Sequence, residues 1–268
     1  MLGEPTLTHR SEGGHDIPLL VWRLPVPVRS ISSAVLGGGV GECRWVVNAS
    51  VPMSYDRDDP AVHLAELAAG LGLSGPGVGL LTGVDVADVV AAADEGVRVW
   101  ATVGLGAPIQ AAANVERPAV PSSTPERQAI TPGRQAIPSS TSERQAVPSS
   151  TPKRQAVPSS TPDRLRPGTV NVVVWVPPRL GDAALVNAVA TVTEAKTQAI
   201  RELGLAATGT ATDAVCVLCP AEGEAAEYGG PRSTWGARLA RAAYRAVLRG
   251  GAINLAGTQS WSDRAGRP

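Results

Sequence analysis

The stretch TGTATDAVCVLCP, residues 208–220, contains side chains that can do chemistry. Thr208, Thr210, Thr212 and Asp213 occupy a predicted turn that leads into an apolar, strand-like run. Loops fixed to the end of a buried strand often carry binding or catalytic groups. The same residue types also form turns that satisfy only their own backbone. The spacing therefore supports a catalytic and a structural interpretation about equally.

The two cysteines in this stretch favour packing over chemistry. Cys216 and Cys219 lie in or just after the strand-like run, where residues three apart point to opposite faces. Cys43 is the only other cysteine of the chain, whereas a structural zinc site takes four ligands. We therefore expect small, apolar, reduced side chains here, with no metal site and no resident cofactor.

Lys196 is the second candidate, because it falls on the apolar side of a predicted helix. At about 100° per residue, Leu185, Val192 and Ile200 share one arc with it. A lysine that faces the interior needs a partner or a lowered pKa, and such groups are common at functional sites. In the structural alternative, its stem packs and its amine reaches the rim of the fold.

The run ISSAVLGGGVG ends a predicted strand in three glycines, Gly37, Gly38 and Gly39. Consecutive glycines let backbone N–H groups approach a ligand closely, as in an anion nest or an oxyanion hole. Ser33 precedes this turn and can act as a nucleophile or as a hydrogen-bonding group. No Gly-Lys-Ser/Thr follows, so the run is not a Walker loop. A purely structural turn is the commoner meaning of such glycines.

Three further polar features lie on predicted elements. Asn48 interrupts the apolar run VVNASV, so a buried amide there needs hydrogen-bond partners from a ligand or from the backbone. His63 and Glu66 lie on the polar side of their helix, where we expect a solvated pair rather than a catalytic dyad. Arginines recur along the last predicted helix, where a solvent-exposed face is the commoner meaning. They are Arg238, Arg241, Arg245 and Arg249.

These residues lie on segments that alternate between strand and helix patterns. Apolar, β-branched runs bounded by Gly or Pro predict strands at 31–36, 44–51, 78–83, 97–105, 169–176 and 213–218. Helical patterns cover 60–71, 85–94, 182–203 and 233–249. Strands mixed with helices predict an α/β or α+β domain built on a layered sheet.

Two segments share one order of elements. Each runs from a strand through Val-Pro and a helix into a Gly/Thr turn followed by an acid, which is Asp85 in the first and Asp213 in the second. This order indicates two similar β-α-β units. We expect the two turns to lie close together and to frame a cleft.

Composition limits the class of protein. The chain has 268 residues, of which 43% are apolar, which is enough for one large domain. Lysine plus arginine equals aspartate plus glutamate at 24 each, so charge gives no case for a nucleic-acid partner or an anionic membrane. No uninterrupted apolar run approaches the roughly 18 residues of a membrane span, and no signal-peptide pattern begins the chain. A cytoplasmic protein is expected, of undetermined oligomeric state.

A repeat interrupts the predicted domain. Residues 117–163 repeat a ten-residue unit such as RQAVPSSTPK, with one Val or Ile per unit. One apolar residue cannot offset an ordering entropy of about 1–2 kcal/mol per residue. We therefore predict a disordered Pro/Ser/Thr-rich insertion over 117–166 inside a single domain at 17–250. Tails are predicted at 1–16 and 251–268.

Several stretches, taken in order, resemble the adenosylcobinamide amidohydrolase family. They are SSAVLGGG, WVVNASVP, VGLLT, VWATVGLGAP, PGTVNVVVWV, ALVNAVATVTEAKTQAI, TGTATDAVCV and GPRSTWGARLARAAY. The repeat is a departure from the family pattern. The resemblance implies hydrolysis of the amide that joins the corrin f side chain to aminopropanol in adenosylcobinamide. Adenosylcobyric acid and 1-amino-2-propanol would be the products, in salvage of incomplete corrinoids.

Such a reaction needs an activated water or nucleophile, donors for the oxyanion and an acid for the amine. By type and location, Asp213 is expected to be the base or the water-orienting group, and Thr210 or Thr212 to position water or substrate. Lys196 is the candidate electrostatic stabiliser or proton donor. The expected substrate-binding groups are Ser33, the backbone at Gly37, Gly38 and Gly39, and Asn48. The main alternative is a non-catalytic corrinoid- or nucleotide-binding module.

Overall fold

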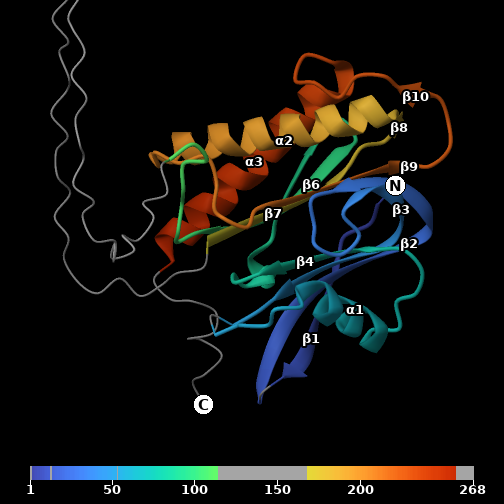
Figure 1. Cartoon of the computed structure of the whole chain (residues 1–268). Coiled ribbons are helices and arrows are strands. Elements are labelled where there is room, and N and C mark those ends of the chain that lie inside the picture. Colours follow the sequence, from blue (N-terminus) through green and yellow to red (C-terminus); the bar gives the residue numbers. More distant parts are fainter. Residues whose placement is uncertain (1, 13, 53, 114–167, 258–268) are drawn as a thin grey trace, which may run out of the picture. The chain divides into compact units, whose positions relative to one another are not determined.

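One mixed sheet of eight strands carries the fold, in the order β4-β3-β2-β9-β7-β6-β5 with β1 paired to β2 (Figure 1). The computed structural model describes residues 2–12, 14–52, 54–113 and 168–257. The strands of this sheet are β1 (Thr6–Glu12), β2 (His15–Ser32), β3 (Gly39–Ser50), β4 (Val78–Thr82), β5 (Val90–Asp94), β6 (Val97–Leu105), β7 (Gly168–Trp175) and β9 (Ala214–Pro220). The helices are α1 (Pro60–Gly70), α2 (Asp182–Glu202) and α3 (Thr234–Ala256), with a short 3-10 turn η1 (Val86–Asp88). Two short strands, β8 (Arg179–Leu180) and β10 (Ala225–Ala226), pair with each other.

The sheet folds into two halves that pack face to face. The long strands β2 and β3 run from one half into the other. The pairing of β2 with β3 shifts register between Arg23 and Val28, and beyond this shift β2 also pairs with β9. Side chains of both halves share one core, with Trp22 from β2 edge-on to Trp100 from β6. Helix α1 packs on the outer face of the β2–β3 half, whereas α2 and α3 cover the outer face of β6, β7 and β9 (Figure 1). The result is four layers, in which helices enclose two sheet halves.

The predicted mixed α/β class is confirmed. Both predicted β-α-β units are present, since β3 pairs in parallel with β4 across α1, and β7 with β9 across α2. Pro60 begins α1 as expected, and Ser233 caps α3 by accepting a hydrogen bond from the backbone N–H of Gly236 at 3.1 Å. Among the helices of the described residues, none combines the length and the hydropathy of a membrane span.

The helix predicted over 85–94 is wrong. The segment forms η1 and then strand β5, which pairs antiparallel with β6. Glu95 and Gly96, both at positive φ, make the two-residue turn that joins these strands. The alanines of this segment favour a helix intrinsically, but pairing with the buried strand β6 overrides that preference.

The domain extends beyond the predicted boundaries on both sides. Residues 6–12, assigned to a tail over 1–16, form β1 along β2, and α3 continues to Ala256, past the predicted end at 250. Strand β1 is mostly exposed, so it carries little of the apolar signal by which strands are recognised. The predicted insertion at 117–166 and the end of the predicted tail, 258–268, lie outside the described residues.

The arginines of α3 form ion pairs with the β5–β6 hairpin. Arg241 donates two hydrogen bonds to the carboxylate of Asp94, at 2.8 and 2.9 Å, and Arg245 donates a third at 3.0 Å. Arg238 pairs with Glu95 and lies over the ring of Trp235. These arginines therefore hold α3 against the β5–β6 edge of the sheet.

These contacts predict a pH-dependent contribution to stability. Hydrogen bonds from Arg241 and Arg245 lower the pKa of Asp94 to about 2. A carboxylate with a depressed pKa stabilises the fold above its unfolded pKa and stops doing so as pH falls through the folded value. Near neutral pH, we expect the parent protein to unfold at a higher urea midpoint than Asp94→Asn. The difference between the two midpoints should disappear between about pH 4 and pH 2. A difference that stays constant over this range would contradict the assignment.

Candidate active site

A cavity of about 400 Å³ opens where the two sheet halves approach each other. Its walls come from the loop after β2, the loop between β3 and α1, strand β4 with its following turn, and the first residues of β7 and β9. Both Gly/Thr turns of the predicted units contribute, through Thr82 and Gly83 from one and Thr212 and Asp213 from the other. The expected cleft between the two turns is therefore present.

Asp213 holds the wall of this cavity in place. Its carboxylate accepts hydrogen bonds from the Lys196 amine, from both the hydroxyl and the backbone N–H of Thr210, and from the backbone N–H of Val170 at 2.9 Å. A carboxylate offers about four lone-pair sites, so these donors fill it. The two charged side chains are only 9% and 11% exposed, which makes them a nearly buried ion pair.

The Lys196 amine therefore has the partner that its apolar surroundings demand. Gly209 lies against both charged groups, and a Cβ atom there would overlap the carboxylate and the amine. The ion pair therefore requires a glycine at position 209, because a larger residue would occupy its space. Thr212 lies on the cavity side of this turn, where its hydroxyl is 2.8 Å from that of Thr169.

A chain of amides connects the cavity with the core between the sheet halves. The Asn48 side chain donates to the Thr102 hydroxyl at 3.0 Å and accepts from Asn171 Nδ2 at 2.9 Å. Asn171 Nδ2 also donates to the carbonyl of Leu81 at 2.9 Å, and these two acceptors fix which end of the amide is nitrogen.

The other end of this amide has no protein partner. In the described part of the chain, Asn171 Oδ1 is the one buried side-chain oxygen without a hydrogen bond. Asn171 is 1% exposed and lines the cavity. A buried oxygen left unpaired costs about 1–3 kcal/mol, so a ligand N–H in the cavity would find a strong acceptor here.

The loop after β2 separates this cavity from another of about 550 Å³ beside α1. Ser33 lies on the first cavity, where its hydroxyl accepts a hydrogen bond from the backbone N–H of Val215 at 3.0 Å. Gly37 and Gly38 line the second, and a Cβ atom at Gly37, which has φ +71°, would overlap the carbonyl of Gly77. Close backbone packing therefore explains the glycine turn without a ligand.

The structure brings together part of the predicted site. Ser33, Thr212 and Asp213 line one cavity. Lys196 and Thr210 do not line the cavity but donate hydrogen bonds to Asp213, and Asn48 accepts one from Asn171. The predicted glycines lie outside this lining, with Gly39 already paired to Ser32 at the start of β3. Their predicted role in substrate binding stays a prediction.

Sequence reasoning missed Asn171, although it interrupts TVNVVVWV as Asn48 interrupts VVNASV. It also placed His63 in solvent, which is wrong, since His63 is 3% exposed. His63 Nδ1 lies 3.1 Å from the hydroxyl of Tyr55, and Tyr55 lines the cavity. No local pattern indicates this contact, because the β1 strand that lies on the other side of His63 carries little apolar signal.

The remaining groups and surfaces offer less. The three cysteines are free and buried, and burial raises the pKa of Cys43 to about 11. Within the described ranges, no three His, Cys, Asp or Glu side chains gather as metal ligands would.

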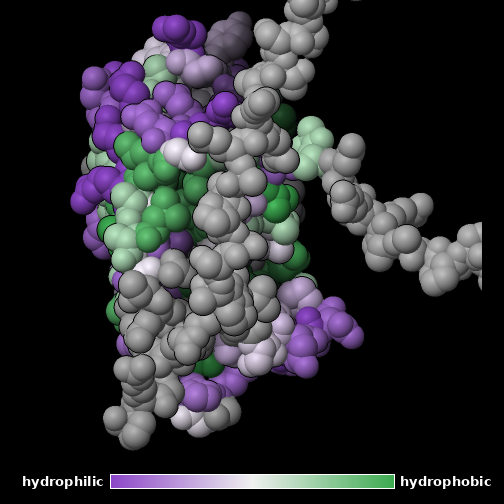
Figure 2. All heavy atoms as spheres, turned by 90° about the vertical axis from the view of Figure 1, so that its left-hand side faces the viewer, coloured by the Kyte–Doolittle hydropathy of each residue, from purple (hydrophilic) through white to green (hydrophobic). Residues whose placement is uncertain are grey.

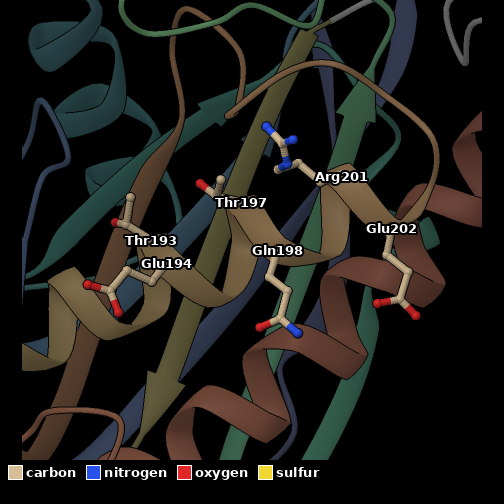
Figure 3. A pocket seen from close by; sticks show the side chains of 6 residues that line it. All are labelled: Thr193, Glu194, Thr197, Gln198, Arg201 and Glu202. Atoms are coloured by element: carbon tan, nitrogen blue, oxygen red, sulfur yellow. The ribbon is translucent and has the colours of Figure 1, made fainter.

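A wider depression of about 640 Å³ runs along α2 (Figure 3). Its described lining comes from successive turns of that single helix, namely Thr193, Glu194, Thr197, Gln198, Arg201 and Glu202. One helix supplies one wall, so the cavity between the sheet halves is the stronger candidate.

Comparison with known proteins places this chain in a family. An adenosylcobinamide amidohydrolase of Halobacterium salinarum is 44% identical over 87 residues, which are 32% of this chain and 36% of that protein. An uncharacterised protein of Methanocaldococcus jannaschii is 37% identical over 89 residues, 30% of this chain and 34% of that protein. The matches thus span about a third of these relatives. The family model described as adenosylcobinamide amidohydrolase matches residues 4–258, and the chain therefore belongs to the adenosylcobinamide amidohydrolase family.

Proposed function

We propose that this chain hydrolyses adenosylcobinamide to adenosylcobyric acid and 1-amino-2-propanol. The observation that carries the proposal is the unpaired oxygen of Asn171, a residue that lines the same cavity as Ser33 and Thr212. A secondary amide has one N–H to donate and one carbonyl to be polarised, and the residues that line this cavity include an acceptor, Asn171 Oδ1, and a hydroxyl donor, Ser33, for the two. Membership of an amidohydrolase family supports the same reaction class.

The dimensions of the cavity fit one arm of the substrate. Pockets for drug-sized ligands measure about 300–1,000 Å³, and a corrinoid is larger than such ligands. A cavity of about 400 Å³ would therefore take the aminopropanol arm and leave the macrocycle at the rim. The lining offers apolar surface at Val35, which is 61% exposed. Figure 2 shows hydrophobic side chains gathered in the middle of one face of the molecule.

Each polar group then has a distinct part. Asn171 Oδ1 accepts the N–H of the substrate amide. The Ser33 hydroxyl proton has no acceptor among the described residues, so it is free to donate to the carbonyl oxygen as negative charge develops there. Lys196 and Asp213 hold the turn that presents Thr212. With its lone pairs filled, Asp213 could orient a water only in exchange for one of its present donors, which favours a positioning role over that of a base.

The proposal is tested by incubating the purified protein with adenosylcobinamide and following both products by mass spectrometry. We expect equal amounts of aminopropanol and adenosylcobyric acid to accumulate. Ser33→Ala should slow their release while adenosylcobinamide still binds. Tight binding of the corrinoid with no amine released by the parent protein would instead identify a binding module.

A further inference from the structure

Three side chains from separate elements form a connected group at the edge of the cavity. Tyr55, from the loop between β3 and α1, lines the cavity and stacks on the ring of His63, with centroids 5.5 Å apart and planes 21° apart. The Tyr55 hydroxyl lies 3.1 Å from His63 Nδ1. On the other side of the ring, His63 Nε2 lies 3.9 Å from the carboxylate of Glu12 on β1. A path of polar atoms thus leads from the cavity to a buried imidazole.

The Glu12 carboxylate favours one direction of proton transfer along this path. A carboxylate near Nε2 favours the tautomer with the proton on Nε2, which leaves Nδ1 to accept the hydroxyl proton of Tyr55. The Tyr55 oxygen then keeps its lone pairs for a group in the cavity.

Other charged groups face this cluster from several elements. Arg10 on β1 and Arg57 in the loop before α1 lie near the ring, and Glu66 lies on α1 itself. Arg10 is paired with Glu12, whereas Arg57 is paired with Asp59 and Glu66. Burial is the main influence on the ring, and it lowers the pKa of His63 below 6.5. The imidazole is therefore neutral at neutral pH and able to take up a proton.

We propose that Tyr55 is a catalytic proton shuttle for amide hydrolysis, and that His63, oriented by Glu12, is the positioning residue that receives and returns the proton through it. This inference rests on the proposed amidohydrolase function. It supplies the acid–base partner that Asp213, with its lone pairs filled, does not offer.

The proton inventory of this route balances. Water oxygen bonds to the amide carbon and gives one proton to the Tyr55 oxygen, as the hydroxyl proton of Tyr55 passes to His63 Nδ1. The carbonyl π electrons move onto oxygen and form the tetrahedral intermediate. When the carbonyl re-forms, the C–N bond breaks and its electron pair stays on nitrogen, which takes a proton from Tyr55 as Nδ1 returns one. The hydroxyl of water ends in the acid and its proton on the amine, with both side chains restored.

The test compares two variants with matched controls in the full-length protein. We expect Tyr55→Phe to lower kcat for adenosylcobinamide about 100-fold or more with KM within about threefold, since proton transfer contributes about 10²–10⁴. His63→Asn keeps an acceptor near the Nδ1 position but cannot take up a proton, so it should lower kcat comparably. Tyr228→Phe and His9→Asn change exposed residues of the same types and should leave kcat unchanged.

The pH profile separates a shuttle from a structural contact. Because the route needs neutral His63, kcat of the parent should fall at acid pH, with a midpoint more acid than that of an ordinary imidazole because burial lowers the pKa of His63, and His63→Asn should remove this acid limb. Retention of more than a third of kcat in Tyr55→Phe, or an unchanged acid limb in His63→Asn, would overturn the shuttle. Should Tyr55→Phe prove unstable on thermal melting, the profile of His63→Asn decides alone. A parent that releases no aminopropanol would overturn the proposed function itself, which is a distinguishable result.

Discussion

Replacing Lys196 by alanine is expected to lower the free energy of unfolding by about 3–5 kcal/mol and to abolish amide cleavage. The substitution removes the only charged partner seen for Asp213 among the described residues and leaves a carboxylate that is 11% exposed. The turn over 208–213 would rearrange to hydrate that carboxylate, and Thr212 would leave the cavity wall with it. Urea unfolding and the aminopropanol assay measure the two effects.

A matched control lies five residues further along the same helix. Arg201 is exposed, so Arg201→Ala should change stability by no more than about 0.5 kcal/mol. Lys196→Met combined with Asp213→Asn removes both charges and should be more stable than Lys196→Ala, because no unpaired charge remains buried. Equal stability of Lys196→Ala and Arg201→Ala would show that the ion pair contributes nothing to the fold.

Lys196 also shows why part of this site could be predicted from the sequence. Its place on the apolar arc of α2 follows from helical periodicity alone, and an interior amine requires an acceptor. The Thr/Asp turn was recognisable because it precedes a buried strand. What periodicity could not show is which group the amine meets, since Asp213 reaches it only through the packing of β9 beneath α2.

The parts that escaped prediction depend on contacts distant in sequence. The helical pattern over 85–94 predicts a helix where β5 pairs with β6, and the mostly exposed strand β1 carries little apolar signal. The Tyr55–His63 contact needs α1 and the loop before it to fold against β1, so no local pattern indicates it. Asn171 was recognisable as a polar residue in an apolar strand, but its unpaired oxygen depends on Asn48 and Leu81 occupying its nitrogen.

Asn171 is the position where binding of the scissile amide can be tested most directly. Asn171→Leu removes the unpaired oxygen at similar volume, and we expect kcat/KM for adenosylcobinamide to fall about tenfold to hundredfold. The loss in kcat/KM combines one hydrogen bond with the cost of leaving the substrate N–H without an acceptor, whereas the lost Nδ2 bonds to Asn48 and Leu81 act on stability. Asn187→Ala, which removes an exposed amide on α2, should leave kcat/KM unchanged.

A substrate analogue identifies the bond itself. An adenosylcobinamide analogue methylated on the amide nitrogen has no N–H to donate, so the parent should process it less well than the natural substrate. Asn171→Leu has no acceptor for the N–H, so its kcat/KM should differ less between the natural substrate and the analogue. The ratio of the two kcat/KM values in the parent, divided by the same ratio in the variant, measures the coupling between the oxygen and the N–H. Asn48→Leu should retain part of the discrimination, because the carbonyl of Leu81 still holds the Asn171 nitrogen. If both variants discriminate as the parent does, the amide binds elsewhere in the cavity and the oxygen of Asn171 serves another donor.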